Sequence, residues 1–376
     1  MILQKFIKMK KYLTNFDEIQ LIPSITTNIE HRSECSPYYN AIWSKEKFDW
    51  NLDSAHLPLF TAPMSCVVND KNYLEFSKNK ITPIIPRTVP YDIRIKLASE
   101  QFWIAMGLEE FECFAINTDT LTSETFICID IANGHMKKLL ELCKFAKHKF
   151  DNKLILMAGN IAEPLAYDEY AKAGIDYVRI MIGSGNGCAT NDLTGIGRNA
   201  LYMLRETRYR QEYVAKSYDS YPLGKYRSVP YIVYDGGCNS IRDIIVALAI
   251  GADYVMCGKI FAQSQEAAGE IIEKAVKNIN NIFTPASENR LARIVEIKDY
   301  VFKPGRMYYG MSTERAQKEM GKTEIKHSEG KEYWIPIEYT LSEWTSQFVA
   351  AIRSTMSYCN AKVLNEFIGK IRCDIN

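Results

Sequence analysis

The stretch from Asp176 to Arg198 is the most informative part of the chain, and it reads Asp-Tyr-Val-Arg-Ile-Met-Ile-Gly-Ser-Gly-Asn-Gly-Cys-Ala-Thr-Asn-Asp-Leu-Thr-Gly-Ile-Gly-Arg. Residues Tyr177–Ile182 are mostly β-branched and apolar, which is typical of a buried strand. Glycines alternate over residues 183–187, so the backbone can turn tightly and expose N–H and C=O groups to a ligand. We expect the thiol of Cys188, at the end of this loop, to be accessible and not packed in the core. The loop alone fits an incidental thiol as well as a reactive one, because a short glycine motif is weakly specific.

Apolar runs of similar length recur along the chain. The eight predicted strands are Leu59–Ala62, Thr82–Ile85, Phe102–Met106, Phe126–Asp130, Leu154–Met157, Tyr177–Ile182, Tyr231–Asp235 and Tyr254–Cys257. Helical patterns lie between most of them, at Lys137–Lys149, Pro164–Ala173 and Ser240–Ile250. This alternation predicts an α/β fold whose parallel sheet closes into a (β/α)₈ TIM barrel. A doubly wound open sheet is the alternative, and it is disfavoured because no Gly-x-Gly-x-x-Gly follows the first strand.

The rest of the chain is interpreted as part of the same domain. The 376 residues are 47% hydrophobic and 24% charged with a net charge of +1, which suits a sizeable core and indicates no nucleic-acid partner. We interpret residues 1–15 as a disordered leader and 16–376 as a single barrel domain, with a flap around 306–340, a loop at Asn280–Lys303 and a terminal helix at Gln347–Phe367. The ten cysteines form no Cys-x-x-Cys pair, so we expect a reducing, cytoplasmic compartment. No apolar run is long enough to cross a membrane.

Two further strand ends carry patterns suited to a nucleotide. Asp235-Gly236-Gly237 closes the seventh predicted strand, where a carboxylate can accept hydrogen bonds from a ribose diol and glycine N–H groups can approach a phosphate. Gly258 and Lys259 follow the eighth strand in the same way. Asp-Gly is also a common turn pair, so an ordinary turn is the simpler interpretation of the first pattern alone. Glycines after both strands favour a phosphate site, because barrels often bind phosphate with these two loops.

The cysteine loop resembles that of the IMP dehydrogenase and GMP reductase family. Residues 183–190 and 194–197 are similar to the family's Gly-Pro-Gly-Ser-x-Cys-Thr-Thr and Thr-Gly-x-Gly, with the cysteine and the second threonine kept. The departures from this pattern are Ser184 for proline, Asn186 for a phosphate-binding serine, Ala189 for the first threonine and Asn191 for a basic residue. The resemblance is strong from Cys128 to Tyr358 and weak from Pro37 to Thr125.

The resemblance implies a site residue by residue. The implied catalytic residues are Cys188, Thr190 and Glu329. The implied substrate-binding residues are Asn186, Asp235, Gly236, Gly237, Gly258, Lys259, Gly310, Met311, Ser312, Lys326, Glu329 and Gly330. The implied cofactor-binding residues are Asp130, Ile131, Ala132, Asn160, Ile182, Gly183, Met311, Ser354, Thr355, Met356 and Ser357. The backbone carbonyls of Gly183, Gly185 and Cys188 are implied to hold a monovalent cation such as K⁺.

Three of these residues also have an ordinary structural interpretation. Glu329 alone fits a solvated surface charge, Thr190 fits a helix cap, and Lys259 fits a side chain that points outward. Agreement with one family's spacing is what favours the functional interpretation.

The implied activity is that of a purine nucleotide oxidoreductase, most similar to the GMP reductases. Such an enzyme takes GMP and NADPH to IMP, NADP⁺ and ammonia through a thioimidate on the cysteine, and a homotetramer is implied as well. An IMP dehydrogenase, an enzyme for a modified purine nucleotide and a non-catalytic nucleotide-binding barrel are the alternatives. The interval from Pro86 to Gln101 is too short for the regulatory modules of IMP dehydrogenases. The segment from Gly310 to Glu329 has no Arg-Tyr pair to activate water. Both features favour the reductase.

Overall fold

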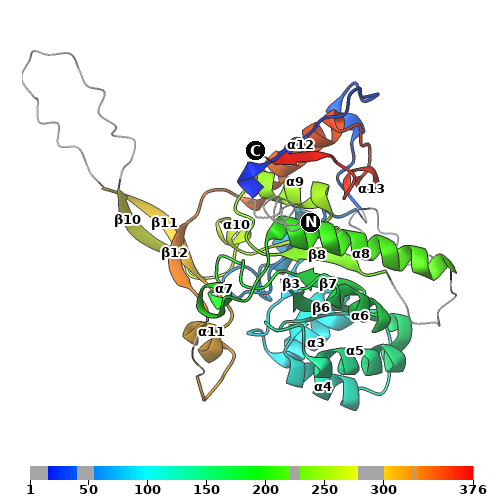
Figure 1. Ribbon diagram of the computed structural model, residues 1–376. Helices are drawn as coiled ribbons and strands as arrows, with labels where there is room; N and C mark the ends of the chain where they lie inside the picture. Colours follow the sequence, from blue (N-terminus) through cyan, green and yellow to red (C-terminus); the bar gives the residue numbers. More distant parts are fainter. Residues whose placement is uncertain are drawn as a thin grey trace, which may run out of the picture.

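The computed structural model describes residues 16–39, 55–220, 229–277, 300–325, 327 and 329–375, so the predicted leader lies outside the described residues. Figure 1 shows a barrel with a protruding flap and with both ends of the described chain on one side. The first elements are η1 (Phe16–Glu18), β1 (Ile19–Leu21) and η2 (Arg32–Glu34). The barrel strands are β2 (Leu59–Thr61), β3 (Ile84–Ile85), β4 (Trp103–Met106), β5 (Thr125–Ile129), β6 (Leu154–Ile161), β7 (Tyr177–Ile180), β8 (Tyr231–Asp235) and β9 (Tyr254–Cys257).

Helices alternate with these strands, as the sequence predicts. They are α2 (Tyr73–Lys78), α3 (Tyr91–Ser99), α4 (Leu108–Asn117), α5 (Lys137–Phe150), η3 (Asp151–Lys153), α6 (Ala166–Lys172), α7 (Thr190–Thr194), α8 (Ala200–Ser220), α9 (Ile241–Ile250) and α10 (Lys259–Ala262). The flap contains β10 (Ile272–Lys277), β11 (Tyr300–Tyr309), α11 (Glu314–Glu319) and β12 (Glu332–Pro336). The chain continues with α12 (Leu341–Tyr358), α13 (Leu364–Phe367) and β13 (Cys373–Ile375).

The eight central strands form one parallel sheet in the order β2-β9-β8-β7-β6-β5-β4-β3. Its two edges meet through a bridge between Phe60 and Thr82, where Thr61 N donates to Thr82 O at 3.0 Å. Pro83 has no N–H, so the ladder cannot continue there and β3 begins only at Ile84. The predicted (β/α)₈ barrel is therefore confirmed, and a single β-bridge joins its first two strands.

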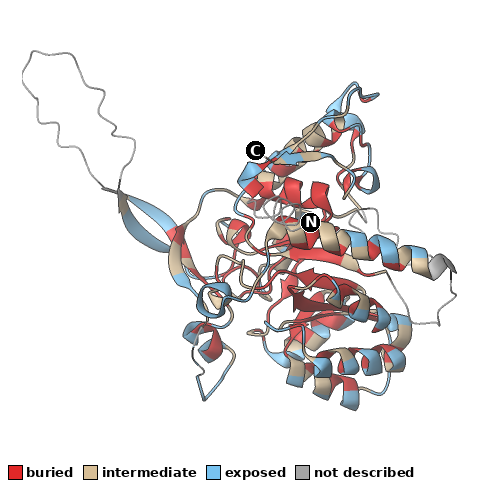
Figure 2. Ribbon diagram, in the orientation of Figure 1, coloured by how far each residue is buried: buried red, intermediate tan, exposed pale blue. Residues whose placement is uncertain are grey.

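Aromatic rings fill the end of the barrel at which the strands begin. Ring centroids lie 5.6 Å apart for Phe60 and Trp103, 5.2 Å for Trp103 and Tyr177, and 5.5 Å for Tyr177 and Tyr254. Figure 2 shows the strands buried and the outer faces of the helices exposed. Side chains alternate along a strand, so Arg179 lies on the same side as Tyr177, one layer nearer the strand ends. The carboxyl ends of the strands are thus the end of the barrel where a ligand can enter.

The flap is built on an antiparallel sheet in the order β10-β11-β12, which the sequence did not predict. Val301 pairs with Val276 and Phe302 with Ala275, so the interpretation of Asn280–Lys303 as a loop is wrong for residues 300–303. Residues 280–299 of that predicted loop lie outside the described residues. Long-range backbone pairing decides this segment, and local composition does not reveal it.

The predicted terminal helix Gln347–Phe367 is two helices. α12 ends at Tyr358, and Asn360 then takes a left-handed φ of 55° while Ala361 N donates to Met356 O at 3.0 Å. Asparagine tolerates this conformation and closes the end of a helix. α13 is a separate short helix that begins at Leu364.

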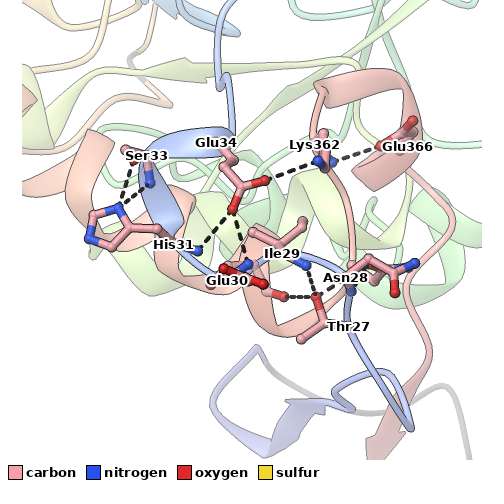
Figure 3. Close-up of polar contacts among 11 residues, drawn as sticks. Thr27, Asn28, Ile29, Glu30, His31, Ser33, Glu34, Lys362 and Glu366 are labelled. Carbon is pink, nitrogen blue, oxygen red and sulfur yellow. Dashed lines mark hydrogen bonds and ion pairs between the residues drawn. The ribbon is translucent and has the colours of Figure 1, made fainter.

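The N-terminal segment is fastened to the C-terminal helices (Figure 3). Glu34 accepts the Lys362 ammonium at 3.0 Å and the His31 N–H at 3.0 Å, and these contacts lower the pKa of the Glu34 carboxyl, the His31 N–H most. Thr27 Oγ1 donates to Ser357 O at 3.0 Å. β1 and β13 extend the contact as an antiparallel pair. Within the described residues, none of the helices has the length and apolar character that a membrane crossing requires.

Candidate active site

A cavity of about 580 Å³ lies over the carboxyl ends of the strands. Its walls come from the ends of β5, β6 and β8, from the loop that holds Cys188 and from the flap. A smaller hollow of about 260 Å³ lies between residues 22–26 and residues 370–372. It contains none of the predicted site residues, so the larger cavity is the candidate active site.

Three predicted catalytic side chains form one chain of hydrogen bonds at this cavity. Cys188 Sγ donates to Thr190 Oγ1 at 3.3 Å, and Thr190 Oγ1 donates to Glu329 Oε2 at 2.6 Å. Ala189 N donates to the backbone oxygen of Glu329 at 2.6 Å, and Cys188 and Gly330 form a bridge. Thr190 is the first residue of α7 and its hydroxyl binds Glu329, so it is not the helix cap. The flap therefore places the Glu329 carboxylate two hydrogen bonds away from the Cys188 thiol, with the Thr190 hydroxyl between them.

Two glycines permit the close approach of loops around Cys188. A side chain on Gly310 would collide with the backbone oxygen of Gly187, and one on Gly236 would collide with the Ser184 hydroxyl. Ser184 stands where the resembling loops have proline, and its buried hydroxyl has no hydrogen-bond partner in the described part of the chain. The flap thus packs backbone to backbone against the cysteine loop, and Gly236 leaves room for the Ser184 side chain.

Arg179 lies between two carboxylates beneath the cavity. Its Nη2 and Nε donate to Asp235 Oδ2 at 2.6 and 3.1 Å, and its Nη1 donates to Asp130 Oδ1 at 3.2 Å. Asn160 Nδ2 donates to the same Asp235 oxygen at 2.8 Å and to Met181 O at 2.9 Å. Asp130 directly follows β5 and Asp235 is the last residue of β8, so this arginine links the ends of two strands at the cavity.

Burial and charge act on this network in opposite directions. Burial alone lowers the pKa of the Arg179 guanidinium, but the nearby Asp235, Cys128 and Asp130 outweigh it and leave that pKa raised. The guanidinium therefore stays charged. Burial raises the pKa of the Cys128 thiol to about 12, so this thiol is a neutral part of the floor.

Cationic side chains lie at two other parts of the wall. Lys259 begins α10 directly after Gly258, and no hydrogen bond or ion pair of its ammonium is formed among the described residues. Arg87 Nη1 donates to the backbone oxygen of Asp130 at 3.3 Å. A free ammonium beside backbone glycines suits an anionic group such as a phosphate.

A known protein family matches most of the chain. The family model described as IMP dehydrogenase / GMP reductase domain matches residues 105–374. The chain belongs to the IMP dehydrogenase/GMP reductase family. Its relationship to individual members is distant, because the relatives described next share less than a third of their aligned residues with it.

Three of these relatives carry the name GMP reductase. GMP reductase 2 of Homo sapiens is 28% identical over 262 residues, which cover 69% of this chain and 64% of the human protein. The GMP reductase of Exiguobacterium sp. (strain ATCC BAA-1283 / AT1b) is 28% identical over 282 residues, covering 73% and 78%. That of Vibrio atlanticus (strain LGP32) is 29% identical over 268 residues, covering 70% and 65%. The match thus spans slightly less than two thirds of the human relative's length.

Most residues that the family resemblance implied lie together at the cavity of this family member. The predicted residues that line it are Asp130, Ile131, Ala132, Asn160, Ile182, Gly183, Gly185, Asn186, Cys188, Thr190, Asp235, Gly236, Gly237, Gly258, Lys259, Gly310, Met311, Ser312 and Glu329. Gly330 reaches the site through its bridge to Cys188. Lys326 lies outside the described residues.

Four predicted cofactor residues do not lie at this cavity. Ser354, Thr355, Met356 and Ser357 are on α12, where Met356 is buried and Ser357 O accepts the Thr27 hydroxyl of the N-terminal segment. Within one chain, they do not join the other predicted cofactor residues. Their role in binding a cofactor stays a prediction.

Several lining residues were not assigned to the site from the sequence. They are Arg87, Arg179, Met64, Tyr308, Gln317, Met320, Lys322 and His327. A signal existed for Arg179, because it is a lone charge in an otherwise apolar strand. Gln317 and Lys322 have no such signal, because the folding of the flap brings them to the cavity.

Proposed function

We propose that this family member is an NADPH-dependent GMP reductase that converts GMP to IMP and releases ammonia. The single observation that supports this most is the hydrogen-bonded chain from Cys188 through Thr190 to Glu329 at the cavity wall. A non-catalytic nucleotide-binding barrel would need the phosphate glycines but would not need these hydrogen bonds between Cys188, Thr190 and Glu329. A cytoplasmic homotetramer is part of the same proposal.

In this proposal the thiol proton of Cys188 is transferred twice, first to Glu329 and then to the leaving amine. Glu329 takes the thiol proton of Cys188 through the Thr190 hydroxyl, which leaves a thiolate, the nucleophilic form of cysteine. The sulfur then bonds to carbon 2 of the purine, and the bond from that carbon to its amine breaks. The protonated Glu329 returns the proton to the departing amine, so that ammonia leaves. The covalent product is a thioimidate on Cys188.

Other residues of the chain would hold the nucleotide during this step. Asp235 Oδ2 is occupied by Arg179 and Asn160, so its Oδ1 is left to accept the ribose hydroxyls. Gly236, Gly237 and Lys259 supply N–H groups and a positive charge for the 5′-phosphate. The backbone carbonyls of Gly183, Gly185 and Cys188 would hold a potassium ion. Gly185 O already accepts Cys188 N at 2.9 Å, which leaves its second lone pair for the ion.

Asn160 and Asp130, which lie next to Asp235 and Arg179, fit a nicotinamide group. Asn160 Oδ1 is buried without a hydrogen-bond partner among the described residues, and Asp130 uses only Oδ1 for Arg179. Asn160 Oδ1 and Asp130 Oδ2 can therefore accept hydrogen bonds from the hydroxyl and amide groups of a nicotinamide nucleotide. When bound there, NADPH supplies the hydride that replaces the sulfur on carbon 2 and frees Cys188.

One observation favours the dehydrogenase as a second candidate. His327 lies on the flap and lines the cavity, and an imidazole is a suitable base for activating water. Arg315 does not line the cavity, since it pairs with Glu332 at 2.8 Å and lies over the Tyr309 ring. A dehydrogenase would thus depend on His327, whereas the proposed reductase does not.

The test runs both reactions on the purified protein. We expect loss of NADPH absorbance that requires GMP, with IMP and ammonia formed in equal amounts. XMP formed from IMP and NAD⁺, abolished by His327→Ala and without GMP-dependent NADPH loss, would assign the dehydrogenase instead. If neither reaction occurs, the proposal is wrong for these two nucleotides.

A further inference from the structure

Arg179, Asp130 and Asp235 form a clamp, and the proposed chemistry assigns no role to Arg179 in it. Arg179 side-chain exposure is 7%, and its carboxylate partners Asp130 and Asp235 are 14% and 18% exposed. The three residues come from β5, β7 and β8 or their ends. A buried guanidinium with two carboxylates keeps one planar group in contact with both walls of the cavity.

Each carboxylate gives only one oxygen to this clamp. Arg179 and Asn160 bind Asp235 Oδ2, and Arg179 binds Asp130 Oδ1. Among the described residues, no donor reaches Asp235 Oδ1 or Asp130 Oδ2. Asp235 and Asp130 both line the cavity, so one free carboxylate oxygen remains for a ligand on each side.

We propose that Arg179 is a positioning residue that couples the nucleotide and cofactor sites through Asp235 and Asp130. This inference rests on the proposed function, which assigns Asp235 to the nucleotide and Asp130 to the cofactor. A ribose bound to Asp235 fixes the plane of the guanidinium, and that plane fixes Asp130. A ligand that holds one carboxylate thus holds the other through the guanidinium, and the second ligand binds more tightly.

The chemistry of arginine is what the coupling requires. A guanidinium offers five donors in one rigid plane, whereas a lysine ammonium is a point charge that rotates freely. Arg179→Lys keeps the buried positive charge between the carboxylates but removes the rigid link. The coupling should then be lost while each ligand still binds.

The experiment measures the coupling with a pair of ligands that cannot react. IMP lacks the amine that the reductase removes, and NADPH cannot accept a hydride from IMP, so both can be present without turnover. Calorimetry gives the dissociation constant of IMP with and without saturating NADPH, and that of NADPH with and without IMP. Linkage requires both ratios to be the same. In the wild-type protein we expect a ratio of about 5 to 150, the usual range for coupled sites.

The variants are Arg179→Lys and Arg179→Met, with Arg210→Lys as the matched control. Arg210 pairs with Asp168 between α8 and α6, away from the cavity, with Nε at 3.0 Å from Asp168 Oδ1. Arg179→Lys should bring the ratio to about one, while Arg210→Lys keeps the wild-type ratio. Arg179→Met leaves two partly buried carboxylates without their cation and is expected to lower the unfolding midpoint as well.

The outcomes separate this inference from the proposed function. A wild-type ratio of one, or a wild-type ratio kept in Arg179→Lys, overturns the coupling even if both ligands bind. A role of Arg179 in stability alone would lower the unfolding midpoint of Arg179→Lys and leave the ratio unchanged. A wild-type protein that binds neither IMP nor NADPH overturns the proposed function and the coupling together.

Discussion

Replacing Glu329 with glutamine should remove most of the turnover and little of the nucleotide binding. The Thr190 hydroxyl donates to Glu329 Oε2 at 2.6 Å, a length typical of a charge-assisted bond to a carboxylate. Glutamine is similar in size, but its amide cannot take the Cys188 proton and return it to the leaving amine. General acid–base catalysis contributes about 10²- to 10⁴-fold, so kcat should fall by that factor, or about 3–5 kcal/mol of transition-state stabilisation.

The double variant makes this prediction sharper. Thr190→Val breaks the same relay one bond earlier, because the Cys188 thiol reaches Glu329 only through the Thr190 hydroxyl. Substitutions of residues that act as one unit do not have additive effects. The double variant Glu329→Gln with Thr190→Val should therefore lose no more kcat than the less active of the two single variants.

The assay is steady-state NADPH oxidation with GMP, accompanied by calorimetry for IMP binding. Glu332→Gln is the matched control, because Glu332 lies three residues further along the chain and pairs with Arg315 outside the cavity. It should keep the wild-type kcat. A Glu329→Gln enzyme with wild-type kcat, or losses that multiply in the double variant, would refute the relay.

Three other substitutions or reactions test separate parts of the site. Lys259→Ala should weaken GMP binding about tenfold and reduce its dependence on salt in calorimetry, with guanosine unaffected, because the proposed function assigns the Lys259 ammonium to the phosphate and no partner holds it among the described residues. Asp235→Asn should weaken GMP binding by about 1–3 kcal/mol and lower the unfolding midpoint, since Arg179 loses an ionic partner; unchanged binding would remove Asp235 from the ribose site. Alkylation at pH 8, mapped by mass spectrometry, should modify Cys188 and spare Cys128, because Cys128 is buried and its burial raises the pKa of the thiol to about 12; equal labelling of the two would contradict this.

The barrel was predictable because its strands carry strong local signals. Runs such as Tyr231–Asp235 and Tyr254–Cys257 are almost continuously apolar, and they are strands with the predicted bounds. Errors arose where a single residue or a distant partner decides the outcome. Asn360 divides the terminal helix by taking a left-handed conformation, and a partner strand that lies earlier in the chain makes residues 300–303 a strand.

The site was predictable only in part, for a related reason. Cys188 and Thr190 lie two residues apart, so a local motif contains them both. Glu329 is 139 residues further along than Thr190, and only the resemblance to a family linked them before the structure placed them in contact. Arg179 has a local signal, but its two partners lie at the ends of other strands and can be identified only when the barrel closes.

The most direct test of the account is whether GMP becomes attached to Cys188 without any reduced cofactor. The protein is incubated with GMP alone, digested and analysed by mass spectrometry, and the ammonia released is measured in parallel. We expect the nucleotide on the peptide that contains Cys188, one ammonia for each adduct, and conversion of the adduct to IMP when NADPH is added. Absence of the adduct, together with undiminished turnover in Cys188→Ala, would contradict the proposed mechanism.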